Sequence, residues 1–326
     1  MKIQRIPAHS ALALAAALAA SVLTACGGGG DGGSSTDALT DSEAQGYAAD
    51  SATMPVAAAS AVDSSIASVS DAMAASVASG QQQAQRVQAE AATPTTVGCA
   101  MSGSVTYTGD TNNNGQFDKG ESYSVTFNSC KGVDGNVLNG TASITVTDKT
   151  STSLSITHQT TGLQITSPAG YTWTHNGNTT VTRSATTNSI GGIDYSTHIT
   201  SSQSSMLTTS MNSYSASYTL NSLDWTVTRS FDGNGALNSR SHQGTVSIDA
   251  STPRRPNATL QITATGSTLG IGSDGMVHSG SFSVATRRNT ISVTVANNTM
   301  TINLDVGSDG SVDRTWTVTS YANEAG

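Results

Sequence analysis

The feature that most constrains this chain is an alternation of apolar with polar residues that runs from about residue 97 almost to the C-terminus. Successive side chains of a β-strand point to opposite faces of the sheet, so this period of two predicts strands with one buried and one wet face. The polar partners are mainly Ser and Thr. The alternating positions are Ile144 and Val146; Leu154 and Ile156; Leu163 and Ile165; Tyr171 and Trp173; Leu223, Trp225 and Val227; Ile291, Val293 and Val295; Met300, Ile302 and Leu304; and Trp316 and Val318.

Turn signals separate these runs. Asp134-Gly135, Asn139-Gly140 and Asn176-Gly177 are typical of two-residue hairpin turns, and residues 272–275 and 307–310 share the sequence Gly-Ser-Asp-Gly. Strands joined by short turns pair in sequence order. We therefore predict an all-β domain over residues 97–322, a large antiparallel meander that forms a curved sheet, a barrel or a sandwich.

A short Ala-rich helical segment is expected before the β domain, within residues 38–92, which are rich in Ala, Ser and Gln. One apolar stripe at helical spacing supports it, and its members are Val62, Ile66, Val69, Met73 and Val77. The stripe fits a coiled-coil stalk or an oligomerisation helix. It also fits a helix packed on the β domain or a partly disordered spacer, and the shortness of the stripe and its lack of flanking charges favour these two.

The N-terminus has the form of a secretory signal. Lys2 and Arg5 supply a basic region, and residues 11–23 supply an apolar region too short to span a bilayer. The run Leu23-Thr24-Ala25-Cys26 resembles the lipobox of bacterial lipoproteins. That resemblance implies a signal peptide over residues 1–25, cleavage before Cys26, and a covalent lipid on that cysteine.

A Gly/Ser-rich tether over residues 26–37 would follow the lipidated cysteine. The whole chain resembles β-rich proteobacterial lipoproteins, which carry a lipobox, an Ala/Gly-rich leader and Asp/Asn/Gly hairpin loops. In such lipoproteins Asp after the cysteine marks retention at the inner membrane. Gly27 stands there instead, so the resemblance implies an outer-membrane location, on either the periplasmic or the surface face.

The charge balance bears on partners. The formal net charge is −8, and only 11% of the residues are charged. Nucleic-acid binding depends on neutralising phosphates, so an acidic chain does not favour it. We expect the lipid anchor to make the membrane contact, and the sequence leaves a protein or glycan partner open.

Two cysteines remain once Cys26 is assigned to lipid. Cys99 and Cys130 form an even pair in an oxidising compartment, which predicts a disulfide. Val105 and Tyr107 share a face of one predicted strand, and pairing Tyr107 with Tyr123 opposite would set the register of this hairpin. That register places Cys99 opposite residue 131, so the bridge requires a bulge or a strand end near Ser129 and Cys130, at the base of the hairpin.

One motif carries recognisable chemistry. Residues 110–121 match the pattern D-x-[DN]-x-[DN]-G-x₅-E and resemble an EF-hand calcium loop. The flanking residues alternate as strands, so we expect at most a weak, structural calcium site on a β-hairpin. An Asn-rich hairpin tip that binds nothing is the alternative. The resemblance implies oxygen ligands from Asp110, Asn112, Asn114, the Gln116 carbonyl, Asp118 and a bidentate Glu121.

Catalysis has little support. No H-E-x-x-H pair and no G-x-S-x-G elbow occurs, and five scattered histidines are expected to face solvent on strands: His158, His175, His198, His242 and His278. The three tryptophans are expected in the core. The leading hypothesis is a non-enzymatic envelope protein, anchored in the outer membrane, with a structural or binding role. A surface adhesin or binding module is the alternative, and a hydrolase is less favoured.

Overall fold

The computed structural model describes residues 38–78 and 94–319, except 113, 171, 203, 210–214, 253–254 and 298. The predicted signal peptide, Cys26 and the tether lie outside the described residues, as does the segment 79–93. The described part contains one helix, α1 (Asp41–Ala78), followed by strands only. The strands are β1 (Thr95–Gly98), β2 (Ser102–Thr108), β3 (Ser122–Lys131), β4 (Val137–Lys149), β5 (Ser153–Thr166), β6 (Thr172–Thr187), β7 (Ile193–Ser201), β8 (Ser204–Thr209), β9 (Ser215–Phe231), β10 (Leu237–Thr252), β11 (Arg255–Ile271), β12 (Val277–Thr286), β13 (Asn289–Ala296), β14 (Thr299–Val306) and β15 (Arg314–Thr319).

The strands form one antiparallel sheet of fifteen strands in nearly perfect sequence order, which confirms the predicted meander. Only β8 leaves the path, because it pairs with both β6 and β9. The order begins at β1 and ends at β15, so the sheet is curved and open, and neither a closed barrel nor a sandwich forms.

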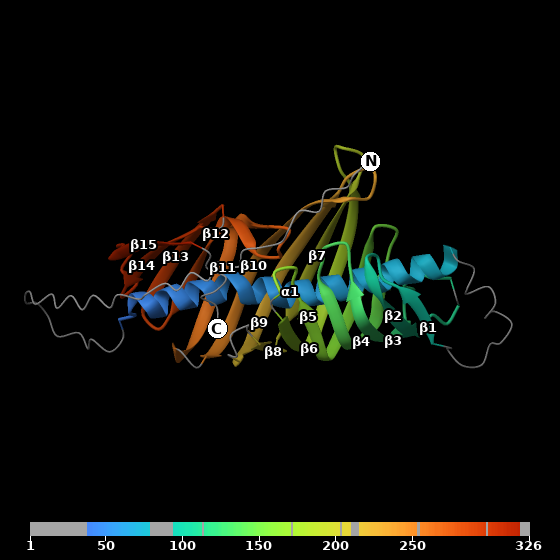
Figure 1. Ribbon diagram of the computed structural model, residues 1–326, viewed down its shortest axis with the longest axis horizontal. Helices are drawn as coiled ribbons and strands as arrows, with labels where there is room; N and C mark the ends of the chain where they lie inside the picture. The colour runs from blue at the N-terminus through green and yellow to red at the C-terminus, as the bar shows by residue number, and fades with distance from the viewer. Residues whose placement is uncertain are drawn as a thin grey trace, which may run out of the picture. The chain divides into compact units, whose positions relative to one another are not determined.

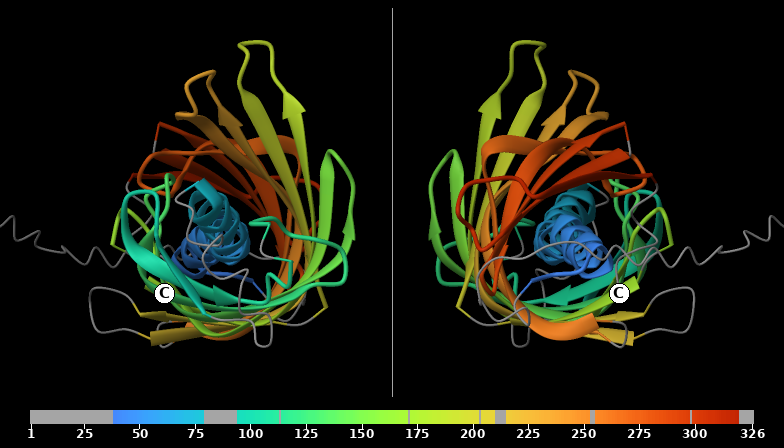
Figure 2. Two further views of the ribbon diagram at one scale, coloured as in Figure 1. Left: turned by 90° about the vertical axis from the view of Figure 1, so that its right-hand side faces the viewer. Right: turned by 90° about the vertical axis from the view of Figure 1, so that its left-hand side faces the viewer.

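The sheet curves around α1, which runs across the strands through the middle of the concave side (Figures 1 and 2). The dimensions fit, since 38 residues make a helix of roughly 57 Å. Fourteen consecutive strands at a spacing of about 4.8 Å span roughly 62 Å. The helix is therefore long enough to pack against the strands across nearly the whole width of the sheet and to form the core beneath them.

Polar contacts tie α1 to the sheet along its length. The helix begins with a capping box, in which the Thr40 hydroxyl accepts from the Glu43 amide and the Glu43 carboxylate accepts from the Thr40 amide. From its N-terminus onward, the contacts are an ion pair of Asp41 with Arg314 of β15, a hydrogen bond from Tyr47 to the Pro256 carbonyl of β11 (2.7 Å), one from Tyr218 of β9 to Asp50 (2.9 Å), and one between Ser65 and His158 of β5 (2.7 Å).

The helix is buried on nearly every side over its first three quarters, rather than along one stripe. Val62, Ile66 and Val69 are fully buried as the stripe predicts, but so are alanines all around the helix. Ala is the best helix former and its small side chain lets strands approach closely from all directions. Of the alternatives left open by the sequence, the helix packed on the β domain is the one observed, with Pro55 inside the helix.

The strands bend so far that their two rims meet across the helix. Successive hairpin connections lie at opposite rims of a meander, which puts the β3–β4 and β5–β6 turns at one rim and the β11–β12 turn at the other. Nevertheless the Ala169 amide of the β5–β6 turn donates to the Asp274 carbonyl of the β11–β12 turn (3.3 Å). These turns therefore form a roof over part of the helix, which the Ser64 hydroxyl contacts through Asp134.

A buried ion network fastens this roof. Arg229 of β9 pairs through Nε with Asp63 of α1 and through Nη2 with Asp134 of the β3–β4 turn (3.1 Å). Arg240 of β10 lies 3.6 Å from the same Asp134 oxygen, and the Ser64 hydroxyl donates to it (2.6 Å). Burial alone would raise the pKa of Asp63, but Arg229 holds that pKa below its ordinary value.

The histidine expectation is wrong for three of five residues. His158, His175 and His242 are completely buried, whereas His198 and His278 keep exposed side chains that contact Asp224 and Asp274. The polar–apolar pattern missed them because the concave face admits polar residues that contact the helix or each other. Burial lowers the pKa of His158 to about 3 and of His175 to about 4, so both are neutral near pH 7.

Two of the predicted Asn-Gly hairpin turns are also wrong. Asn139 lies inside β4 and Asn176 inside β6, where each side-chain oxygen accepts a backbone amide of a neighbouring bulge, from Ser129 (2.8 Å) and from Gly162 (2.6 Å). Four of the observed hairpins, β3–β4, β6–β7, β9–β10 and β11–β12, use five-residue connections with a glycine in the left-handed region. These glycines are Gly135 (φ 80°), Gly191 (φ 78°), Gly235 (φ 82°) and Gly275 (φ 83°).

We expect Arg229→Met to lower the free energy of unfolding by about 3–5 kcal/mol, because it leaves the buried Asp63 without its ion-pair partner and Asp134 with Arg240 alone. Urea denaturation followed by circular dichroism measures this. The matched control is Lys119→Met, which removes an ion pair with Asp148 that is exposed on both sides and should cost about 1 kcal/mol or less. Equal losses in the two variants would contradict the role assigned to the network.

Candidate functional site

The candidate site is a pocket of about 690 Å³ where the roof over α1 is missing. Its floor is the C-terminal part of the helix, where Asp71 and Ala74 are exposed although the preceding turns are buried. Its walls are the β2–β3, β4–β5, β6–β7 and β9–β10 connections, which all lie at one rim of the meander. The pocket size is within the range of small-molecule sites.

Arg183 of β6 is the most unusual side chain in this pocket. Its guanidinium carbon lies 4.4 Å from the centre of the Tyr195 ring, a cation–π contact with the neighbouring strand β7. Its Nε is buried and has no hydrogen-bond partner among the described residues. No carboxylate in the part of the chain that the structure describes forms an ion pair with it, so it is a cation with open hydrogen-bond donors.

The neighbouring charges explain why Arg183 stays unpaired. Asp63 is the nearest buried carboxylate, but Arg229 and a hydrogen bond from Thr197 (2.7 Å) already engage it. Burial lowers the pKa of Arg183, and the charge of Asp63 partly opposes that effect. Asp71 is a further carboxylate at the pocket, on its exposed floor.

Apolar side chains surround the mouth of the pocket. Val133 and Ile193 line it and are 42% and 43% exposed, and Ile190, 58% exposed, stands next to the lining residue Gly191. Exposed apolar residues that gather at one opening mark a site of contact with a ligand or partner more strongly than scattered ones do. Phe231 extends the apolar wall and packs edge-on against Tyr195 (5.8 Å between ring centres).

The calcium-type loop forms one wall of the same pocket. Gly115, Gln116 and Phe117 of this loop line it, as does Lys149 at the end of β4. Asp110 starts the loop as an EF-hand position one would, because its carboxylate accepts the amides of Asn114 (3.2 Å) and Gly115 (2.9 Å). The expected strand flanks are confirmed by β2 and β3.

The side-chain oxygens of the loop are engaged by other donors. The amide nitrogens of Asn112 (2.7 Å) and Asn114 (2.6 Å) donate to Asp118, and Lys149 donates to its other oxygen (3.1 Å). The hydrogen bond from Asn112 is the main cause that holds the pKa of Asp118 below its ordinary value, and Lys149 adds to it. The cation of Lys149 thus already neutralises one of the carboxylates that a metal ion would bind.

Glu121, the predicted bidentate ligand, is similarly occupied. Its Oε1 accepts the amide and hydroxyl of Thr111 (3.0 and 2.7 Å), and its Oε2 accepts the Tyr123 hydroxyl. Gln116, whose carbonyl was expected to ligate, uses that carbonyl to accept the Tyr123 hydroxyl (3.0 Å). Within the described residues no group of three His, Cys, Asp or Glu side chains is placed to hold a metal ion, so calcium binding stays a prediction.

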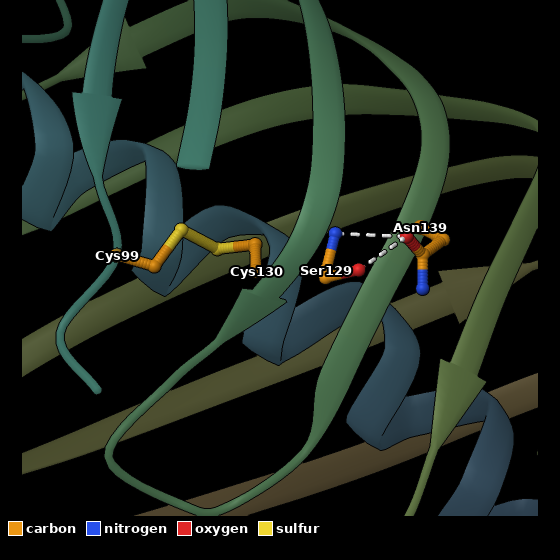
Figure 3. The surroundings of a disulfide bond; sticks show 4 residues. All are labelled: Cys99, Ser129, Cys130 and Asn139. Carbon is orange, nitrogen blue, oxygen red and sulfur yellow. Dashed lines mark hydrogen bonds between the residues drawn. A yellow bond between two sulfur atoms is a disulfide. The ribbon is translucent and has the colours of Figure 1, made fainter. Parts of the chain in front are cut away.

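The predicted disulfide is confirmed. Cys99 follows β1 and Cys130 lies near the end of β3, with their Cα atoms 5.5 Å apart (Figure 3). The expected irregularity is a bulge, because the β3–β4 ladder shifts register between Phe127 and Cys130, and Ser129 has a φ of 47°. Asn139 accepts the Ser129 amide and so satisfies the bulged backbone (Figure 3).

The predicted register of the β2–β3 hairpin is wrong by two residues. Tyr107 faces Val125 instead of Tyr123, and Val105 faces Phe127. A shift of two keeps every side chain on its predicted face, so the burial of these residues agrees with the pattern. The twelve-residue loop decides the register, and its hydrogen bonds are not visible in an alternation.

Two other features of the sequence are structural. Asp305 accepts the amides of Asp309 (3.0 Å) and Gly310 (2.9 Å), which repeats the turn geometry of Asp110 at the far end of the sheet. Trp173 and Trp225 are buried in the core, as expected, and Trp316 is half-buried against it.

Sequence reasoning missed the pocket itself. Arg183 and Tyr195 are polar positions of two separate strands, and only the register that pairs Arg183 with Thr197 brings them onto one face. A single basic residue in a Thr-rich strand was the one available signal, and it does not identify a site without the fold.

Comparison with protein-family models, curated proteins and solved structures finds no match to this chain. No helix of the described region is both long enough and apolar enough to cross a membrane.

The calcium prediction can be tested by comparing the stabilisation that calcium gives to the parent chain and to a variant that lacks the charge of Lys149. If the loop binds Ca²⁺ with a Kd near 0.5 mM, 5 mM CaCl₂ stabilises the fold by about 1.4 kcal/mol and raises the melting temperature, which 5 mM MgCl₂ does not. Lys149→Met should enlarge the calcium shift because it frees Asp118, and Glu121→Gln should abolish it. Scanning calorimetry after treatment with EDTA gives the values. Identical melting with and without calcium in the parent chain and in Lys149→Met would show that the loop binds no calcium.

Proposed function

We propose that this chain is a non-enzymatic lipoprotein of the cell envelope, anchored in the outer membrane by lipid on Cys26, that binds a small ligand in the roof gap over α1. The observation that carries the binding role is the unpaired guanidinium of Arg183 in a pocket of about 690 Å³. Hydrogen-bond donors of a partly buried cation that stay unpaired do not stabilise the fold. A ligand that accepts hydrogen bonds from this guanidinium would gain binding free energy. The anchor rests on the resemblance of residues 23–26 to a lipobox.

The non-enzymatic role is supported by where the candidate catalytic groups lie. Ser65 and His158 are within hydrogen-bond distance (2.7 Å), as in a nucleophile–base pair, but both are fully buried between helix and sheet. No substrate reaches them there, and their contact fixes the helix. The pocket contains charged and aromatic side chains without such a pair among its described residues.

A surface adhesin is the second candidate. The outward faces of the strands are exposed and rich in Ser and Thr, and β1 and β15 leave two sheet edges open. Protease shaving of intact and lysed cells separates the two roles. Cleavage of the β domain on intact cells would favour the adhesin, and cleavage only after lysis would favour a periplasmic binding role.

Cys26→Ser is expected to release the protein from the membrane fraction, because several acyl chains anchor a protein and their loss leaves no apolar attachment. Metabolic labelling with radioactive palmitate, followed by membrane fractionation, measures both lipidation and location. Cys99→Ser is the matched control and should keep the label. Label retained in Cys26→Ser would refute the anchor.

Ala74→Trp is expected to abolish ligand binding, since this exposed helix residue lines the floor and an indole would fill the pocket. The test uses the full lipidated chain in nanodiscs and a library of neutral, anionic and cationic fragments, read by saturation-transfer NMR. Circular dichroism checks that the variant folds. Absence of any fragment whose signal depends on an open pocket would refute the binding function.

A further inference from the structure

We infer that the roof-gap pocket takes an organic carboxylate with an apolar body, with Arg183 as the carboxylate receptor. This rests on the proposed binding function and names its ligand class. The pocket joins two features: a cation with open donors at the inner wall, and apolar side chains at the mouth. A ligand that matches both has an anionic head and an apolar remainder.

The anionic head follows from the charges around Arg183. The concave face at this point holds three arginines, Arg183, Arg229 and Arg240, but its two buried carboxylates, Asp63 and Asp134, are both consumed by Arg229 and Arg240. Arg183 therefore forms no ion pair with either buried carboxylate, and the remaining carboxylate that acts on its charge is Asp71 on the pocket floor. A guanidinium binds a carboxylate through two parallel hydrogen bonds, a geometry that an ammonium does not offer.

Tyr195 prepares Arg183 for this task. The guanidinium carbon of Arg183 lies 4.4 Å from the centre of the Tyr195 ring, and Phe231 packs edge-on against that ring in turn. A cation already held in place loses less side-chain entropy when a ligand binds. Arg183 is thus oriented before the ligand arrives.

The apolar body follows from the remaining walls. Ile193 and Val133 stand exposed at the mouth, and Phe117, Leu154 and Ile66 continue the apolar surface inward toward the helix. Burying this surface favours a ligand with an aryl or alkyl part over a small inorganic anion, because the apolar contact adds to the ion pair.

Asp71 makes the inference testable in both directions. Its carboxylate lies on the pocket floor and interacts with the charge of Arg183, so it opposes an anion in the same space. Removing the charge of Asp71 should strengthen the binding of a carboxylate, whereas removing the charge of Arg183 should weaken it. A merely structural role for the two residues does not give opposite effects on affinity.

The experiment compares three probes of one shape, 4-phenylbutyrate, 4-phenylbutanol and 4-phenylbutylamine, by isothermal titration of the full lipidated chain in nanodiscs, with empty nanodiscs as the blank. We expect phenylbutyrate to bind best. Arg183→Gln should weaken phenylbutyrate by about tenfold to a hundredfold without changing phenylbutanol, and Asp71→Asn should strengthen phenylbutyrate. Arg183→Lys should recover only part of the affinity, because it lacks the planar fork.

Each failure has its own meaning. Equal affinity for phenylbutyrate and phenylbutanol, unchanged in Arg183→Gln, would overturn the carboxylate assignment while the pocket still binds ligands. Preference for phenylbutylamine would overturn it in favour of a cation held by Asp71. If Ala74→Trp leaves the binding of every probe intact, the site lies elsewhere and the proposed function fails as well.

Discussion

The ion network of Arg229 with Asp63 and Asp134 is the interaction on which the arrangement of helix, sheet and roof depends. One side chain joins three segments that are far apart in sequence, the middle of α1, the β3–β4 turn and the end of β9. Both carboxylates are about 1% exposed at their side chains, so the pairs cannot exchange their partners for water. Buried pairs of this kind gain little net stability over apolar residues, but breaking them is costly. Their consequence here is that one position of α1, Asp63, is tied through Arg229 to one strand and one turn of the sheet.

That connection also creates the pocket. Because the β3–β4 turn is held over residues 63 and 64, the roof ends one to two helical turns later, and the helix surface around Asp71 and Ala74 stays open. The two arginines nearest the roof use up the buried carboxylates. Arg183, on β6 and so two strands from Arg229 on β9, is left at the opening, where it contacts the ring of Tyr195 and forms no ion pair within the described residues. The pocket thus lies where the ion network and the roof that it holds come to an end.

Much of the fold could be predicted from the sequence because it rests on local patterns. The alternation of Ile291, Val293 and Val295 predicts which face of the strand is buried. The two cysteines that remain after Cys26 predict the disulfide between Cys99 and Cys130, and the strand register places an irregularity near Cys130. What an alternation cannot carry is long-range geometry. Nothing local to Asn139 distinguishes a hairpin turn from a residue that caps the bulge of its neighbour strand, and both readings satisfy an Asn-Gly pair. The deep bending of the strands around α1 is equally invisible, although it decides which polar residues become buried.

The same limit explains why His158 and Arg183 escaped prediction as members of the interior. On a flat sheet with one solvent-exposed face, a polar residue rarely occupies the same face as the apolar residues of its strand. A polar residue at an alternate position is exposed to solvent. Here the concave face encloses a helix that offers hydroxyls and carboxylates of its own, such as Ser65 and Asp63, so the interior can satisfy polar groups from the sheet. A sheet wrapped around a helix of this composition therefore has polar positions on both faces, and those on the inner face pair with the helix, as His158 does, or with each other, as His175 does with Thr160. Arg183 has no such hydrogen-bond partner among the described residues, so our proposal of a binding role rests on the gap in the roof and not on the outer surface of the strands.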